Sequence, residues 1–332
     1  MRQAELLVEV HRGPFLESAH FGHAVICNGR GQIVKAWGDE NLVTLPRSSV
    51  KMIQALPLIT SGAAEAYGLT DRHLALSCAS HQGAAVHTDF VSDWLTNLGL
   101  GDSDLRCGPQ MPDDKKARIA LIKEDNDPCQ WHNNCSGKHS GFLTLSKHLK
   151  ASAEYIAPDH PVQKATLEAF EMVTGAPSHG FGIDGCSAPN FAARLVDIAK
   201  AMAWFASSAE RSDIASSAAF RLVGAMRANP LLVAGVGRAC TELMEAMDGR
   251  VAIKTGAEGF FTAILPEQKW GIALKITDGG ARASACAMAT LLAEIGVLER
   301  SHLVAQKYLK NPVLNRRGIV TGHIRGASVL TL

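Results

Sequence analysis

The chain has 332 residues, of which 47% are hydrophobic and 20% are charged, and its formal net charge is +1. This size and composition are typical of a globular protein with a substantial core. A charge so close to neutral, with no cluster of basic residues, attracts neither nucleic acid nor anionic lipid. We therefore expect neither nucleic acid nor a membrane among its partners.

The start of the chain does not have the pattern of a signal peptide. Glu5 and Glu9 stand where a signal peptide needs an uninterrupted apolar stretch. No run of about 18 apolar residues, the length that spans a membrane, occurs elsewhere. The sequence therefore predicts a cytoplasmic protein. Its eight cysteines are then expected as buried thiols, metal ligands or catalytic groups, and not as a disulfide framework.

Strand patterns occur near both ends of the chain, and helix patterns occur between them. Alternating and β-branched residues predict strands over Glu5–Val10, His23–Cys27, Gln32–Trp37, Arg250–Lys254, Gly259–Leu265 and Trp270–Ile276. Apolar residues at spacings of three and four predict helices over His87–Leu98, His160–Thr174, Phe191–Ala206 and Ile214–Ala228. A helix of small residues is predicted over Ala281–Leu298.

This order of elements predicts an α+β fold. One antiparallel sheet is expected from about residues 1–45 and 250–280, with a large helical region, about residues 46–249, inserted between its strands. The C-terminal helix over residues 281–298 follows. No linker or repeat divides the chain, so we predict a single unit over residues 1–332.

Ser48 and Lys51 have the Ser-x-x-Lys spacing at the predicted start of a helix. Thr44 and Pro46 suit the cap and the first turn of that helix. Residues three apart share a helix face, so Lys51 can take the proton of the Ser48 hydroxyl. For this the pKa of the lysine must fall about three units from about 10.4. Alone the pattern is weak, because it occurs about once by chance in a chain of this length.

Lys254-Thr255-Gly256 strengthens the hypothesis of a serine hydrolase. Serine hydrolases of the β-lactamase and penicillin-binding type carry such a motif downstream of their Ser-x-x-Lys helix. The layout therefore resembles the serine β-lactamase-like fold, which serine-dependent glutaminases share. The Ser-Asp-Asn element of penicillin-recognising enzymes is missing, which argues against β-lactam chemistry, and His132–His139 stands in that region instead.

Ser80 is a second candidate serine. It lies in Ser77–Gly83, a loop that mixes reactive and small residues as binding loops do. Lys254 can serve Ser80 as Lys51 serves Ser48, and two close lysines lower each other's pKa. A role as a helix cap or turn residue explains Ser80 equally well.

Six motifs together resemble those of the rhizobial-type L-asparaginases, in the same order and over nearly the whole chain. They are Leu45–Lys51, Ser77–His81, Cys107–Gln110, His132–His139, Gly182–Cys186 and Lys254–Gly259. The string Asn-Asn-Cys-Ser-Gly-Lys-His within the fourth is highly specific. The resemblance implies a homodimer that hydrolyses L-asparagine to L-aspartate and ammonia (EC 3.5.1.1). It also implies two serine–lysine pairs, Ser48 with Lys51 and Ser80 with Lys254.

The same resemblance implies a zinc site made by Cys135, Lys138 and Cys186. Thiolates hold zinc well, and three protein ligands leave a fourth position open. A lysine ligates only when deprotonated, so the affinity for zinc should fall as the pH falls. Spacing alone does not indicate a metal here, because no Cys-x-x-Cys pair is present. Zinc can orient the substrate without activating water.

Binding a free amino acid needs a carboxylate opposite its ammonium group and a cation opposite its carboxylate. Asp184 is the candidate for the first role, and Arg47 or His139 for the second. Cys240 matches a further site-lining cysteine of the resembled family, although packing in the core explains it equally well.

Three alternatives to an L-asparaginase stay open. A serine-dependent glutaminase differs by one methylene in the substrate, which an apolar pocket distinguishes by only about 1–3 kcal/mol. A zinc-dependent amidohydrolase, in which the metal activates water, would lose turnover without its metal. A noncatalytic protein that binds an amino acid or zinc would keep the pocket without the chemistry.

Overall fold

The computed structural model describes residues 2–332 and divides into two compact units. The unit here called the sheet unit contains residues up to Ser49, Ala193–Ser207 and Glu242–Leu332. The other, the helical unit, contains Val50–Ala192 and Ser208–Thr241. Each unit is described by itself below, and the single unit expected over residues 1–332 stays a prediction.

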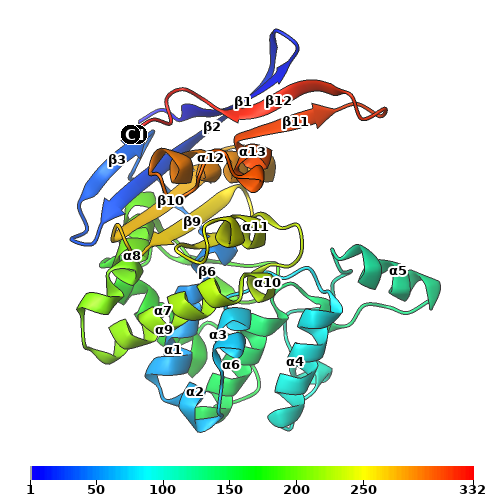
Figure 1. Cartoon of the computed structure of the whole chain (residues 1–332). Helices are drawn as coiled ribbons and strands as arrows, with labels where there is room; N and C mark the ends of the chain where they lie inside the picture. The colour runs from blue at the N-terminus through cyan, green and yellow to red at the C-terminus, as the bar shows by residue number, and fades with distance from the viewer. Residues whose placement is uncertain (1) are drawn as a thin grey trace. The chain divides into compact units, whose positions relative to one another are not determined.

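The sheet unit is built on an eight-stranded antiparallel sheet to which both ends of the chain contribute (Figure 1). The strand order is β11-β12-β1-β2-β10-β9-β8, with β3 paired to β2. The strands are β1 (Glu5–Arg12), β2 (Phe15–Asn28), β3 (Ile33–Trp37), β8 (Ala252–Thr255), β9 (Phe260–Leu265), β10 (Trp270–Ile276), β11 (Lys310–Leu314) and β12 (Val320–Gly326). This arrangement confirms the expected α+β class and all six predicted strands.

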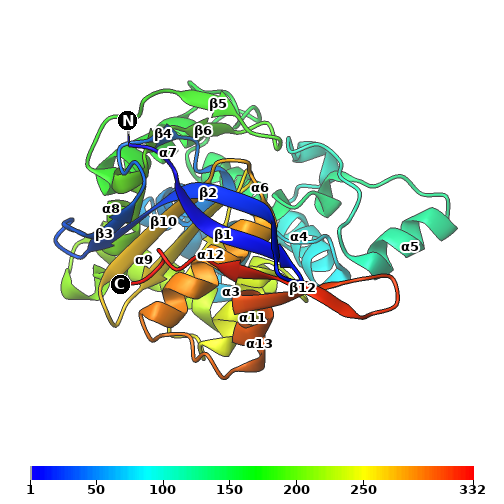
Figure 2. The same ribbon diagram turned by 90° about the horizontal axis from the view of Figure 1, so that it is seen from above.

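Strand β2 organises the sheet because it pairs with three other strands. Its first half pairs with β1, its second half pairs with β3, and β10 runs along the opposite edge of that second half. Figure 2 shows this strand beside β1, with the C-terminal hairpin of β11 and β12 next to them. That hairpin was not predicted, because β11 alternates between half-buried and exposed residues, β12 buries only Gly322 and Ile324, and neither strand carries an apolar run.

Helices α8 (Leu195–Ala206), α12 (Ala281–Glu294) and α13 (Leu303–Leu309) complete the sheet unit. Helix α8 packs on β10, β2 and β9, and α12 packs on the sheet at β12, β1, β10 and β9. All six residues of β9 are buried, and successive strand residues face opposite sides, so both faces of the central sheet are covered. Short strands β4 (Val43–Thr44) and β7 (Ala193–Arg194) form a separate pair.

The helical unit is centred on α1 (Lys51–Thr60), whose residues from Lys51 to Leu58 are buried. It packs against three longer helices, α6 (Ser136–His148), α7 (Pro161–Thr174) and α9 (Ile214–Ala228). The other helices are α2 (Ala63–Ala66), α3 (Asp71–Ser77), α4 (Ala85–Asn97), α5 (Lys115–Lys123) and α10 (Pro230–Val233), with 3₁₀ turns η2 (Asp102–Asp104), η3 (Gln130–His132) and η4 (Ser208–Glu210). A small hairpin pairs β5 (Phe181–Ile183) with β6 (Pro189–Phe191). Helix α11 (Ala239–Ala246) crosses the division between the units.

Most predicted helices are confirmed, and one begins later than expected. The helix expected over Phe191–Ala206 begins at Leu195, because the residues before it pair as strands with β5 and β4. The helix expected over Ala281–Leu298 ends at Glu294. None of the eight cysteines forms a disulfide within residues 2–332. None of the helices in residues 2–332 has both the length and the apolar character needed to cross a membrane.

The packing of α8 on β10 depends on Gly271, and this can be tested. A Cβ atom there would lie 2.1 Å from the amide nitrogen of Ala203 and 2.4 Å from the carbonyl oxygen of Ala199. Gly271→Ala should therefore lower the stability by about 1–3 kcal/mol or more, because the helix must move away from the sheet. Thermal unfolding followed by circular dichroism measures the loss.

The control is Gly224→Ala, in the middle of α9, where an added Cβ meets nothing within 4 Å. Alanine in an open helical position should stabilise by about 0.5–1 kcal/mol. Equal melting temperatures for Gly271→Ala and the wild type would contradict this account of the packing.

Candidate active site

Lys51 is a buried lysine at the first position of α1, with a side chain bonded to three groups. Its exposed fraction is 1%. Its Nζ lies 3.1 Å from Ser80 Oγ and 3.1 Å from Cys135 Sγ, and it also donates to the carbonyl oxygen of Ala79. The candidate base Lys51 is thus hydrogen-bonded to the second candidate serine, Ser80, and to the predicted zinc ligand Cys135.

Ser48 lies in a 3₁₀ turn, η1 (Arg47–Val50), directly before α1. The amide and the hydroxyl of Ser49 both donate to the carbonyl oxygen of Pro46, at 3.2 and 2.7 Å, and this closes the turn. The α-helix therefore begins at Lys51, slightly later than predicted. Arg47 has φ +54°, a left-handed backbone that costs free energy for a residue other than glycine and is commonest at functional sites.

The turn that carries Ser48 lies against the Lys254-Thr255-Gly256 motif within the sheet unit. A Cβ on Gly256 would be 2.6 Å from the carbonyl oxygen of Pro46, and Thr262 Oγ1 on β9 donates to the carbonyl oxygen of Ser49 at 2.8 Å. Lys254 is buried on β8, and its Nζ donates to the carbonyl oxygen of Thr255 at 2.7 Å. The turn at the start of the Ser-x-x-Lys motif therefore lies beside the Lys254–Gly256 motif.

The candidate residues therefore fall into two groups. The sheet unit holds Arg47, Ser48 and Lys254, and the helical unit holds the remaining candidates. In each of the pairs Ser48–Lys51 and Ser80–Lys254, one residue belongs to the sheet unit and the other to the helical unit. Both pairings therefore stay predictions.

The loop that carries Ser80 is held by hydrogen bonds on both sides. The amide of Ser80 donates to Val233 at 2.9 Å, and the amide of His81 donates to Asn134 at 3.1 Å. His81 Nδ1 accepts from the amide of Gly83, so Nε2 donates to Ser136 Oγ at 2.9 Å. Burial lowers the pKa of His81 well below its usual value, so the ring is neutral. His81 therefore fixes Ser80 relative to the start of α6, a role that the sequence did not indicate.

The three predicted zinc ligands converge at the start of α6. Cys135 is the N-cap of the helix and hydrogen-bonds to Cys186, and Lys138 Nζ lies 3.0 Å from Cys186 Sγ. The bond from Cys135 lowers the pKa of Cys186 well below its usual value, and the charge of Lys138 adds to this. The same bond raises the pKa of Cys135. Burial alone would lower the pKa of Lys138, but the charge of the Cys186 thiolate raises it.

This donor set fits zinc chemically. Two thiols and an amine that converge can replace their protons with one soft metal ion. No group of three or more His, Cys, Asp or Glu residues that could hold a metal occurs in residues 2–332. A site whose third ligand is a lysine contains only two residues of those types, so that finding does not exclude it.

Asp184 and Cys186 share the short loop of the β5–β6 hairpin. The loop is closed by the amide of Asp184, which donates to Ala188 at 2.9 Å, and by the amide of Ser187, which donates to Asp184 at 2.8 Å. The charge of Asp184 contributes to the raised pKa of Lys138, so the carboxylate belongs to the same electrostatic cluster. This is consistent with a role opposite a substrate ammonium group.

His139 is fully buried and has one ring nitrogen without a partner. Tyr155 Oη accepts from the amide of Arg106 at 2.7 Å and shares a hydrogen bond of 2.8 Å with His139 Nδ1. Within residues 2–332 the other ring nitrogen, Nε2, has no hydrogen-bond partner. Burial lowers the pKa of His139 well below its usual value, which favours the neutral ring, and its role opposite a substrate carboxylate stays a prediction.

Cys240 lies in the first turn of α11 and is buried. Burial is compatible both with packing in the core and with lining a site, so both interpretations stay open.

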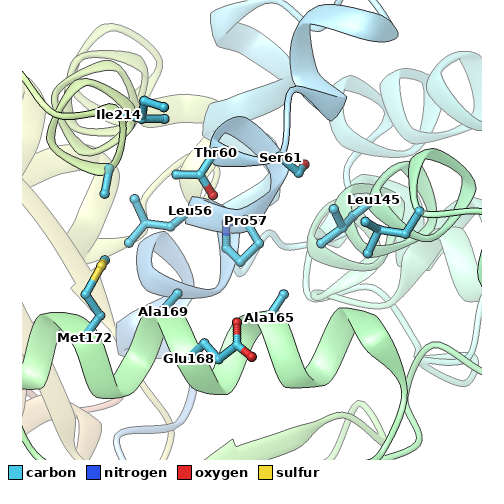
Figure 3. Close-up of a pocket in the computed structure, with 12 residues that line it drawn as sticks. Leu56, Pro57, Thr60, Ser61, Leu145, Ala165, Glu168, Ala169, Met172 and Ile214 are labelled. Carbon is cyan, nitrogen blue, oxygen red and sulfur yellow. The ribbon is translucent and has the colours of Figure 1, made fainter.

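One pocket in the helical unit is lined by none of the candidate residues. It has a volume of about 550 Å³ and lies between α1, α6, α7 and α9. Figure 3 shows its apolar lining, with Leu56 and Pro57 from α1 facing Met172 from α7 and Ile214 from α9. Glu168 is the one ionisable residue among those that line it, so it contains no serine–lysine chemistry.

A family assignment agrees with this cluster of reactive side chains. The model of the L-asparaginase II family matches residues 8–326. The chain belongs to the L-asparaginase II family. Membership confirms the resemblance seen in the sequence motifs and the expected amidohydrolase class. No curated protein matches the chain in sequence.

Solved structures resemble the chain weakly. A β-lactamase (Mb2281c) from Mycobacterium bovis is 12% identical, with 82% of this chain and 94% of that chain covered and a TM-score of 0.46. The protein Mglu is 13% identical, with coverage of 85% and 68% and a TM-score of 0.45. A penicillin-binding protein homologue from Pyrococcus abyssi, described as octameric, is 12% identical, with coverage of 90% and 80% and a TM-score of 0.39.

The thiol pair of this family member gives a spectroscopic prediction. In metal-free protein, a thiolate absorbance near 240 nm should persist well below pH 9, the ordinary pKa of a thiol, because Cys135 and Lys138 stabilise the Cys186 thiolate. Cys186→Ser should remove this absorbance. Lys138→Met should move the titration to higher pH.

The matched control is Cys286→Ser, because burial raises the pKa of Cys286 to about 12 and its thiol carries no charge at neutral pH. A titration curve that is the same in wild type and Cys186→Ser would show that the thiolate resides elsewhere.

Proposed function

We propose that the protein is an L-asparaginase that hydrolyses L-asparagine to L-aspartate and ammonia through a serine activated by a lysine. The observation that carries the proposal is the buried Lys51, whose Nζ lies 3.1 Å from Ser80 Oγ, in a chain of the L-asparaginase II family. A buried lysine bonded to a serine hydroxyl is suited to general base catalysis.

In the proposed first step, Lys51 takes the proton of Ser48 while the serine oxygen attacks the side-chain amide carbon of the substrate. Backbone amides near the start of α1 stabilise the oxyanion that forms. The carbon–nitrogen bond then breaks, and Lys254 supplies through Ser80 the proton with which ammonia leaves. Water hydrolyses the resulting aspartyl ester and restores the serine.

The contacts of Lys51 support proton exchange with Ser80. A charged ammonium donates three hydrogen bonds, and Lys51 has three acceptors in Ala79, Ser80 and Cys135. To act as a base it must accept one hydrogen bond instead. The carbonyl oxygen of Ala79 cannot donate, whereas the Ser80 hydroxyl can both donate and accept. Ser80 is therefore a suitable link between the two lysines, and it is also the alternative nucleophile.

Three residues are proposed to bind the amino-acid part of the substrate. Asp184 faces the α-ammonium group, and Arg47 provides the cation opposite the α-carboxylate. His139 adds a neutral hydrogen-bond donor, which its unpaired Nε2 supports. Cys240 lines the same site.

We also propose that Cys135, Lys138 and Cys186 hold zinc. When bound there, zinc supplies a Lewis acid that orients the substrate. Because Lys138 is protonated in the metal-free site, it must release its proton before its nitrogen can act as a ligand. The homodimer and the cytoplasmic location suggested by the sequence remain proposals with this function.

The serine assignment predicts distinct losses of activity. Wild type should release ammonia from L-asparagine about 10- to 200-fold more efficiently than from L-glutamine. Ser48→Ala should lower kcat/KM for L-asparagine by about a thousandfold or more, because the nucleophile is lost, and Ser80→Ala by about a hundredfold, because proton transfer is impaired. A coupled ammonia assay measures both.

Ser77→Ala is the matched control, because Ser77 ends α3 directly before the same loop and its hydroxyl donates to the carbonyl oxygen of Leu74. It should stay within a few-fold of wild type. An acyl adduct found on Ser80 by mass spectrometry would exchange the roles of the two serines. Ammonia release from neither amide would reject the asparaginase and the glutaminase together.

The zinc proposal predicts a pH-dependent affinity. Zinc binding measured by calorimetry should weaken by about tenfold per pH unit, as the pH falls, for each proton released. Lys138→Met should weaken binding and reduce that slope by one proton. Lys147→Met, on the exposed side of the same helix, should change neither.

Removing zinc with a chelator should raise KM and leave most of kcat. Complete loss of turnover, restored by zinc, would instead support the zinc-dependent amidohydrolase.

A further inference from the structure

Asn190 carries a buried carboxamide that none of the described residues satisfies. Its exposed fraction is 3%, and within residues 2–332 neither Oδ1 nor Nδ2 has a hydrogen-bond partner. An amide left unpaired inside a protein costs the desolvation free energy of its donor and its acceptor. Native proteins keep few such groups, and each needs an explanation such as a bound ligand.

The position of Asn190 in β6 explains why the protein itself provides no partner. The next residue, Phe191, packs its ring against Phe170 and Phe181, at centroid distances of 5.9 and 6.3 Å. Successive strand residues face opposite sides, so Asn190 faces away from these aromatic rings. Its cross-strand neighbour is Gly182, which has no side chain to bond with it.

The hairpin that carries Asn190 is attached to the candidate active site. Its loop holds Asp184 and Cys186, and Lys138 on α6 donates to Cys186 at 3.0 Å. The backbone bond from the Asp184 amide to Ala188 keeps this loop closed. Asn190 thus belongs to the same rigid hairpin as two of the candidate site residues.

A second buried asparagine, Asn133, has a structural role and serves as a comparison for Asn190. Asn133 is 5% exposed, and its amide is fully bonded. Its Nδ2 donates to the carbonyl oxygens of Cys107 and Gly108, at 2.9 and 3.0 Å, and its Oδ1 accepts from the amide of Cys135 at 2.9 Å. Asn190 has none of these bonds, so local structure does not account for it.

We propose that Asn190 is a specificity-determining residue that binds the neutral carboxamide group of the substrate. This inference rests on the proposed function and deepens it. Oδ1 accepts a hydrogen bond from the substrate N–H, and Nδ2 donates to the substrate carbonyl oxygen. A carboxylate has no donor for Oδ1, so the acid product binds less well than the amide.

The test compares Asn190→Leu with Asn133→Leu, each a change to an apolar residue of similar size. Asn190→Leu should melt at or above the wild-type temperature, because it removes an unpaired polar group, whereas Asn133→Leu should melt lower. Asn190→Leu should raise KM for L-asparagine about tenfold, by loss of two neutral hydrogen bonds. The inhibition constant of L-aspartate should change less than about threefold, because repulsion between Oδ1 and one carboxylate oxygen offsets the hydrogen bond that Nδ2 donates to the other.

Three outcomes would overturn the proposal. One is an unchanged KM. Another is a melting temperature that falls as far as in Asn133→Leu, which would mean that Asn190 is structural. The third is an equal loss for L-asparagine and L-aspartate, which would place Asn190 on a group that amide and acid share.

Failure of the proposed function is distinguishable from failure of this inference. If wild type releases no ammonia, the function fails, and calorimetric binding of L-asparagine and L-aspartate then tests Asn190 directly. Weaker binding of the amide alone in Asn190→Leu supports the inference, and equal or absent effects on the two ligands reject it.

Discussion

The burial of the Lys51 ammonium group is the constraint on which the rest of the candidate site depends. Removing this cation from water is tolerable only if its three protons find acceptors. The acceptors come from the loop after α3 and from the start of α6, so burying one side chain determines where both segments lie. The hydrogen bond of His81 to Ser136 then joins the same two segments a second time and keeps Ser80 in place.

A second buried lysine in the helical unit, Lys138, has its charge compensated by the thiolate of Cys186. Lys138 keeps its proton because the Cys186 thiolate lies against it, and the thiolate persists because Cys135 and both lysines stabilise it. Removing either Lys138 or Cys186 leaves the charge of the other buried without a partner, which costs more free energy than the lost contact itself. The chemistry of the serine and the chemistry of the thiols are therefore coupled through Lys51, which touches Ser80 and Cys135 at once.

The sequence predicted helices and strands where the buried residues produce a clear periodic spacing of apolar residues. Helix α9 and strand β10 have the expected bounds, because their apolar residues follow one pattern from end to end. The C-terminal hairpin was missed, because a half-exposed edge needs no apolar run. The start of α8 was misplaced, because pairing of β6 with β5 in a hairpin and of β7 with the distant β4 overrode local helix propensity. The motifs located the candidate residues, but the bond of Lys51 to Ser80 joins positions on different elements, and no spacing reveals it.

Buried polar side chains that have hydrogen-bond partners, such as Asn133, support the fold, whereas His139 and Asn190, which have unpaired atoms, belong to the candidate site. Asn133, Ser136 and His81 are satisfied by the protein and hold loops together. His139 and Asn190 are buried with unsatisfied atoms, so the fold gives up stability to keep them. Local rules are most often broken at functional sites, where a ligand supplies what the chain lacks. Because Asn190 shares its hairpin with Cys186, and Lys138 donates a hydrogen bond to Cys186, the proposed recognition of the amide and the proposed metal site depend on one element of this chain.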